Sequence, residues 1–365
     1  MNIFVFGSSI VSSYWNGAAT YYRGIYKYLA HRGHHITFAE PDAYGRQEHR
    51  DNGDYSYVHS VLYTPHADID RMLDHAAEAD VVIKHSGLGV DDDLLEARVP
   101  ELRDQCAVFF WDVDAPSTIG RLHADANDPF RAQIPRYDGI LTYGGGPVAR
   151  DEYLTFGARR YQSIYNGLDP DTHHPVPSSP DLHCDILFLG NRLPDREQRV
   201  DELFLCAAQL APGKQFVLGG EGWADKSLPS NVRWIGHVST DDHNRLNCSA
   251  GMVMNINRSS MASFGFSPPT RVFEVAGAGA CMLCDDWPGL EDCFEVGREI
   301  LVVRCAQDVA NALHKYDSAT RKQIGAAFRT RALRDHTYAQ RAELAERVFT
   351  ECLDARAAVA ADSAA

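Results

Sequence analysis

The feature that most constrains the fold is an alternation of short apolar strands with helices, which runs through the chain twice. In the first half, apolar runs at residues 2–7, 80–84 and 106–111 each end in polar or glycine-rich residues. The pattern restarts at residues 185–189 and continues to residues 300–303. Strands of a parallel sheet are apolar throughout, because helices cover both of its faces. The sequence therefore predicts an α/β fold with two doubly wound, Rossmann-like domains.

A segment rich in proline and serine separates the two halves. Residues 166–180 read NGLDPDTHHPVPSSP, a composition typical of a linker. We therefore expect a first domain at residues 1–170 and a second domain at residues 171–335. We also expect the linker to act as a hinge, since Gly167 can absorb a change of φ and ψ that other residues cannot.

Charge and composition exclude several classes of function. The 365 residues carry a net charge of −15, which argues against a nucleic-acid-binding surface. No stretch approaches the ~20 apolar residues of a membrane span, and the N-terminus opens into a strand without a secretion signal. The nine cysteines have no framework spacing and are interpreted as reduced thiols. We expect a cytoplasmic protein without a membrane span.

Two motifs that would hold a cofactor are incomplete. The first strand lacks a G-x-G-x-x-G sequence, because two serines follow Gly7 and Gly17 stands alone, which disfavours a dinucleotide. Cys281 and Cys284 form a C-x-x-C, but positions three apart in a strand face opposite ways. No second cysteine pair completes a zinc site. We expect neither a cofactor nor a metal.

The most informative stretch is residues 263–288, SFGFSPPTRVFEVAGAGACMLCDDWP. A glycine and serine loop leads to two prolines, which fit the first turn of a helix. That helix is small and apolar except for Arg271 and Glu274, which lie three residues apart on another face. A surface ion pair would explain the two charges. A ligand-binding carboxylate would explain them as well, together with the adjacent loop.

The order loop, prolines, R-x-x-E, A-G-A-G-A, apolar strand, D-x-x-P-G-L resembles the nucleotide-sugar site of GT-B glycosyltransferases. It is especially similar to the CgeB-like, spore-maturation-type branch, which is related to glycosyltransferase families 1 and 4. The N-G-L-D-P…H-P linker resembles the hinge of these enzymes, and His336, Tyr338 and Arg341 resemble the C-terminal signature of the branch. The resemblance implies two domains facing across a cleft, with the C-terminal helix (residues 336–365) crossing back to the N-terminal domain.

The resemblance also implies the activity. A sugar would move from a nucleoside-diphosphate-sugar to an acceptor hydroxyl or amine, without a metal and with no cofactor besides the donor substrate. Glu274 would grip the ribose hydroxyls, while basic side chains and helix N-termini would hold the diphosphate. The expected donor site comprises Gly190, Asn191, Arg196, Arg199, Gly236, His237, Val238, Asn257, Pro269, Thr270, Arg271 and Glu274.

Three residues are candidates for catalysis. Arg196 would stabilise the leaving diphosphate, and His85 stands at a strand end where many GT-B enzymes present a histidine to the donor sugar. Asp114 is a candidate general base on the acceptor side, together with Asp112 and Gly17. Asp112 and Asp114 also form a D-x-D that could bind a divalent cation, and a turn-capping role for Asp114 stays open.

One departure from the family leaves the stereochemistry open. The broader retaining family has an E-x7-E motif, and the position of its first glutamate is Phe266 in this chain. Two rival functions remain: a nucleotide-sugar 2-epimerase, which shares the fold and donor site, and a non-catalytic protein that binds sugar nucleotides, which the missing glutamate favours. The base and sugar of the donor, the acceptor (a glycan, a small molecule or a protein) and the oligomeric state do not follow from the sequence.

Overall fold

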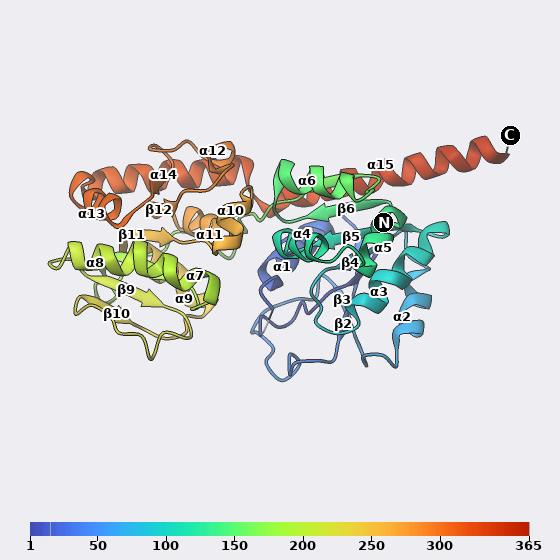
Figure 1. Cartoon of the computed structure of the whole chain (residues 1–365), viewed down its shortest axis with the longest axis horizontal. Helices are drawn as coiled ribbons and strands as arrows, with labels where there is room; N and C mark the ends of the chain where they lie inside the picture. The colour runs from blue at the N-terminus through green and yellow to red at the C-terminus, as the bar shows by residue number, and fades with distance from the viewer. Residues whose placement is uncertain (15, 365) are drawn as a thin grey trace. The chain divides into compact units, whose positions relative to one another are not determined.

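The chain divides into two compact units (Figure 1). A computed structural model describes residues 1–14 and 16–364, apart from the side chains of residues 241, 363 and 364. The first unit contains Met1–Asn166 together with Tyr338–Ala365, and the second contains Gly167–Thr337. We describe each unit by itself.

The first unit is built on a parallel sheet of seven strands in the order β3-β2-β1-β4-β5-β6-β7. Its central strand β1 pairs with β2 on one side and β4 on the other, so that Ile3 lies between Ile36 and Val81. The chain reverses its direction of winding between β1 and β4, which makes this the topological switch point of the sheet. The strands are β1 (Asn2–Phe6), β2 (His35–Pro41), β3 (His59–Tyr63), β4 (Val81–His85), β5 (Ala107–Asp112), β6 (Gly139–Thr142) and β7 (Tyr161–Ser163).

The last helix of the chain completes the core of the first unit. Helix α15 (Tyr338–Ala364) packs on α1 (Ala19–His31) so closely that a Cβ on Gly24 would lie 2.3 Å from the Tyr338 ring. Phe349 of α15 is buried against the sheet. The helix continues to Ala364, well past residue 356, where the sequence predicted fraying. The other helices are α2 (Ile69–Ala76), α3 (Asp92–Arg98), η1 (Val99–Asp104), α4 (Ala115–Ala124), α5 (Pro129–Gln133), η2 (Ile134–Arg136) and α6 (Gly146–Thr155).

The second unit repeats this topology with six parallel strands in the order β10-β9-β8-β11-β12-β13. Its switch point lies between β8 and β11, which pair in parallel. The strands are β8 (Cys184–Leu189), β9 (Phe216–Gly219), β10 (Val232–Trp234), β11 (Ala250–Asn255), β12 (Met282–Asp285) and β13 (Leu301–Val303). The predicted pair of doubly wound α/β sheets is thus confirmed.

Helices cover both faces of the second sheet, and alternate strand residues enter different core layers. Ile186 packs under the helices that follow β8, whereas Leu187 packs under α11 (Thr270–Ala278). Cys281 and Cys284 also enter different layers, as their spacing predicted. The other helices are η3 (Pro180–Leu182), α7 (Pro194–Val200), the π-helical turn η4 (Asp201–Leu205), α8 (Cys206–Leu210), α9 (Thr240–Ser249), α10 (Ser259–Phe264), α12 (Leu290–Cys293), α13 (Ala306–Lys315) and α14 (Ser318–Asp335).

The proline-rich linker is fastened to the second unit along much of its length. The Leu168 amide donates to the carbonyl of His336 at 2.7 Å. The Asn244 side chain accepts from the His174 amide at 3.3 Å and donates to the Thr172 carbonyl at 2.8 Å. Most of the segment predicted to be a hinge therefore belongs to the body of the second unit.

Three properties of the structure concern the sequence-based expectations about membrane spans, cysteines and metals. None of the described helices combines the length and the apolar character that a membrane crossing requires. All nine cysteines are free thiols. In the part of the chain that the structure describes, no three His, Cys, Asp or Glu side chains are grouped as metal ligands.

Candidate functional site

The candidate site lies at the carboxyl ends of β8 and β11, at the switch point of the second sheet, where parallel α/β sheets bind ligands. Residues 190–193 follow β8 and lead into α7, and residues 256–258 follow β11. The turn after β9 packs against the turn after β8, because a Cβ on Gly220 (φ +122°) would lie 2.4 Å from the carbonyl oxygen of Gly190. Only glycine permits this approach at residue 220.

Arg199 is tied into a buried network at the end of β12. Its Nη2 lies 2.7 Å from Oδ2 of Asp285, which is 1% exposed. Asp285 also accepts from Asn255 Nδ2 at 2.9 Å and from the Asn257 amide at 3.0 Å. Burial raises the pKa of Asp285, and the Asn257 amide and Arg199 only partly offset that effect. The structure thus gives Arg199 a carboxylate partner that the sequence did not predict.

Arg196 lies one helical turn before Arg199 and has no such partner. No described carboxylate lies within 4.0 Å of it, and its Nη1 donates only to the carbonyl of Asn191, at 3.4 Å. Its Nε is buried without an acceptor. Burial lowers the pKa of Arg196, and repulsion from Arg258 adds to this effect. A half-buried, unpaired cation at a strand-end site is expected to bind an anion.

Other buried donors at this edge also lack acceptors. Nε of Arg199 and Nδ2 of Asn257 are enclosed without a hydrogen-bond partner. Each unpaired donor of this kind costs about 1–3 kcal/mol. Together with Arg196, they form a set of donors that the oxygens of a phosphate group could satisfy.

Glu274 is held by three basic side chains. Its Oε2 lies 3.2 Å from Arg271 Nη1 and 3.5 Å from His243 Nδ1, and its Oε1 lies 4.0 Å from His173 Nε2. Burial alone would raise the pKa of Glu274, but Arg271, His243 and His173 outweigh burial and hold it well below its usual range. Glu274 is therefore an ionised, nearly buried carboxylate rather than half of a solvated surface pair.

The sequence did not identify the two histidines around Glu274. The rings of His173 and His243 are stacked with their centroids 6.2 Å apart. His243 lies on α9, whose polar sequence has no apolar periodicity and gave no helix signal. His173 lies in the linker, where its pairing with His174 was the only feature of the sequence that could have indicated a functional histidine.

The remaining predicted donor residues also lie at strand ends or helix starts of the second unit. Residues 236–238 follow β10, where Gly236 accepts from the Gly220 amide at 2.7 Å and His237 is exposed. Pro269 is the N-cap residue of α11 and Thr270 its first residue, without a side-chain cap on that terminus. The free amide groups there suit an anion.

Phe266 occupies a strained backbone conformation beside this terminus. Its φ is +48°, and its amide donates to the Pro288 carbonyl at 2.7 Å. A Cβ on Gly289 would lie 2.3 Å from the Phe266 ring. The position that the broader retaining family gives to glutamate is thus an aromatic ring packed on the turn after β12.

His85 in the first unit differs from the prediction of a ligand-facing histidine. Its side chain is 1% exposed, and its Nε2 lies 2.5 Å from the hydroxyl of Tyr26. The rings of Tyr22 and Trp111 lie 4.4 and 5.4 Å away between centroids. Burial lowers the pKa of His85 to about 3. His85 is thus a neutral residue of the aromatic core, because β4 turns its last side chain inward.

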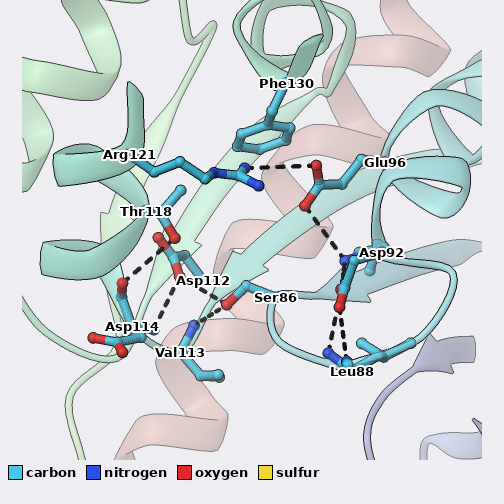
Figure 2. A network of polar contacts seen from close by, with 12 residues as sticks. Ser86, Leu88, Asp92, Glu96, Asp112, Val113, Asp114, Thr118, Arg121 and Phe130 are labelled. Atoms are coloured by element: carbon cyan, nitrogen blue, oxygen red, sulfur yellow. Dashed lines mark hydrogen bonds and ion pairs between the residues drawn. The ribbon is translucent and has the colours of Figure 1, made fainter. Parts of the chain in front are cut away.

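Asp112 also differs from its prediction as an acceptor-side residue or a cation ligand. Figure 2 shows its carboxylate beside Ser86 and Asp114. It accepts from Ser86 Oγ at 2.7 Å, from the Asp114 amide at 2.9 Å and from the Tyr153 hydroxyl at 2.6 Å. Since the side chain is fully buried, its oxygens serve to shape the loop after β5.

Asp114 and Gly17 remain accessible. Asp114 is half-buried at the N-cap of α4, and its carbonyl accepts from the Thr118 hydroxyl at 3.4 Å (Figure 2). Gly17 lies before α1, which begins at Ala19, and a Cβ there would meet nothing within 4 Å. Gly17 is therefore exposed to solvent, and Asp114 is partly exposed.

Comparisons with known proteins agree with this architecture. A family model described as glycosyl transferase-like matches residues 196–347. No curated protein matches the chain in a sequence search. Sucrose-phosphate synthase from Thermosynechococcus elongatus has a similar structure at 14% identity, with a TM-score of 0.67 over 97% of this chain and 100% of that chain.

Two further solved structures match over nearly the whole chain. Anabaena HepE in complex with UDP-glucose gives a TM-score of 0.65 at 12% identity, covering 96% of this chain and 100% of that chain. An alpha-glucosyltransferase in complex with UDP and a 13-mer DNA gives a TM-score of 0.68 at 12% identity, covering 96% of this chain and 99% of that chain. At these identities the likeness defines the fold, which is that of the GT-B glycosyltransferases.

Proposed function

We propose that the protein is a glycosyltransferase that uses a nucleoside-diphosphate-sugar as donor. The observation that carries the proposal is Arg196, a half-buried cation without a carboxylate partner at the switch point of the second sheet. The unpaired guanidinium suits a diphosphate, which offers it several acceptor oxygens.

The other residues of the site have roles that follow from their chemistry. The uncapped N-terminus of α11 would bind the diphosphate together with Arg196. The ionised Glu274 would accept hydrogen bonds from the ribose hydroxyls. As the glycosidic bond breaks, the leaving diphosphate gains charge, and these fixed donors stabilise it. We propose that arginine and helix dipoles supply the positive charge, so that transfer needs no metal.

The acceptor side is less defined. We keep Asp114 as the candidate general base, since it is accessible at a helix start of the first unit. The acceptor would be a hydroxyl or an amine of a glycan, a small molecule or a protein. We also keep the proposal of a cytoplasmic protein, which the free cysteines suit.

Calorimetric titration with UDP, GDP and dTDP tests the donor site first. UDP is the leading candidate, because the Anabaena HepE structure contains UDP-glucose and the alpha-glucosyltransferase structure contains UDP. Arg196→Met should abolish most of the binding. Arg192→Met is the matched control, since it removes the same charge four residues earlier in the chain, yet Arg192 is paired with Glu197 and Asp225, each at 2.8 Å.

Transfer is then measured with the matching labelled nucleotide sugar and a panel of acceptors. Label found on an acceptor supports the proposal. Conversion of the donor to an epimer without any acceptor would assign the site to an epimerase. If no nucleotide binds, or if both arginine variants bind as wild type does, the proposal is overturned.

A further inference from the structure

A second candidate site lies in the first unit, at the amino-terminal ends of its strands. A cavity of about 430 Å³ opens there between α15 and the residues that precede β5, β6 and β7. This is the opposite edge of the sheet from His85 and Asp114. Its lining residues are Arg103, Asp104, Asp138, Arg159, Arg160, Cys352, Ala355, Arg356, Val359 and Ala360.

One wall of the cavity carries two arginines in fixed positions. Asp138, which is 5% exposed, accepts from Nε of Arg103 at 2.7 Å and lies 3.4 Å from Nη1 of Arg356. The amide of Val108 donates to the same carboxylate at 2.9 Å. Asp138 is therefore fully occupied by the protein, and it orients two guanidinium groups that come from distant parts of the chain.

The other wall carries two arginines without a carboxylate partner. No described carboxylate lies within 4.0 Å of Arg159 or Arg160, and Arg159 donates only its Nε, to the Pro135 carbonyl at 2.7 Å. The cavity thus has two more cations than carboxylates among its lining residues. The net charge of the chain is −15, so this local excess runs against the charge of the whole protein.

We propose that this cavity binds a small phosphorylated compound. Guanidinium forks match the oxygens of a phosphate group in geometry as well as charge. A volume of about 430 Å³ falls in the range of small-molecule sites. Ala355, Val359 and Ala360 of α15 form an apolar wall that would cover the uncharged part of the ligand. The site is separate from the nucleotide site and does not depend on the proposed transferase activity.

The test uses the full-length protein carrying Arg196→Met, so that the nucleotide site does not contribute to binding. Calorimetry measures the affinity for glucose 6-phosphate, with glucose as the uncharged control. Arg159→Gln combined with Arg160→Gln should raise the Kd at least about tenfold, the effect of losing charge-assisted hydrogen bonds. The matched control combines Arg150→Gln with Arg298→Gln, two exposed arginines that are paired with Asp151 and Glu295 outside the cavity.

Loss of binding in the cavity variant alone supports the proposal. Equal weakening in both double variants would show a general charge effect and would overturn it, as would an absence of glucose 6-phosphate binding. Co-sedimentation with phosphatidylglycerol vesicles tests whether the phosphate group that binds in the cavity belongs to a lipid headgroup rather than to a soluble compound. If the cavity variant alone loses vesicle binding, the site recognises a lipid headgroup and the assignment to a soluble compound is wrong.

Discussion

Replacing Arg196 and Arg199 in turn by methionine should separate ligand binding from stability within one helix. Both changes remove a guanidinium and leave an unbranched side chain of similar length. Arg196 and Arg199 lie one turn apart on α7, so effects on helix propensity and on net charge are matched. What differs is the partner, because Arg199 is bonded to Asp285 and Arg196 has no carboxylate partner.

The magnitudes follow from those partners. Removing one member of a buried pair costs about 3–5 kcal/mol. Arg199 is partly exposed, and Asp285 keeps two other donors, so we expect Arg199→Met to lower the free energy of unfolding by about 1–3 kcal/mol. For Arg196→Met we expect an unchanged or higher free energy of unfolding, because the change removes a buried donor that has no acceptor. The same variant should lose about 1.5–3 kcal/mol of nucleotide affinity, or roughly 10- to 100-fold in Kd.

Urea unfolding and calorimetry with UDP measure both quantities on the same preparations. The expected result is a crossed pattern, in which one variant loses affinity and the other loses stability. If Arg196→Met destabilises the protein as much as Arg199→Met does, and leaves nucleotide affinity unchanged, then Arg196 is a structural residue. The reasoning from unpaired charge would be refuted.

Three further predictions concern Glu274, metal dependence and pH. Glu274→Gln should weaken nucleoside-diphosphate binding about tenfold or more by calorimetry; unchanged affinity would leave Glu274 only as the partner of Arg271. Transfer should survive EDTA, and a loss that Mn²⁺ or Mg²⁺ restores would contradict a metal-free site. The pKa of His85 is lowered to about 3 in the folded protein, whereas in the unfolded chain it is about 6.5. The stability that comes from burying the neutral ring is therefore fully present above pH ~6.5. That contribution should fall by about 1.4 kcal/mol per pH unit as the pH decreases from there towards 3. Urea unfolding at pH 7, 6 and 5 should show a shallower slope for His85→Gln than for wild type, and parallel curves would contradict it; exposed His237→Gln is the control.

The fold was predictable because its buried strands are continuous apolar runs between helices. The strand that escaped prediction is β3, whose sequence HSVLY buries only Tyr63 at the sheet edge. Helix α9 escaped for the same reason, since Leu246 is the one aliphatic side chain that it buries. An element that buries little apolar surface leaves little periodicity in the sequence.

The candidate site was predictable only in part. The contrast of one glutamate with an apolar helix pointed to Glu274, and the structure places that carboxylate among three basic groups. The pairing of Arg199 with Asp285 joins residues 86 positions apart, and no local pattern reveals such a contact. Likewise, the inward orientation of His85 depends on Tyr22 and Tyr26 of another element.

The discontinuity of the first unit has a consequence for synthesis of the chain. Helix α15 supplies Tyr338, Ala342, Ala345, Phe349 and Cys352 to a core whose other buried residues belong to the first 166 positions. After it has translated the first 166 residues, the ribosome must translate the whole of Gly167–Thr337 before it reaches α15. At about 5–20 residues per second, the first unit waits on the order of 10 to 30 seconds for its last helix. The unit whose synthesis starts first should therefore be the last to complete its core. Until α15 is made, chaperones would have to cover the apolar surface on which this helix packs.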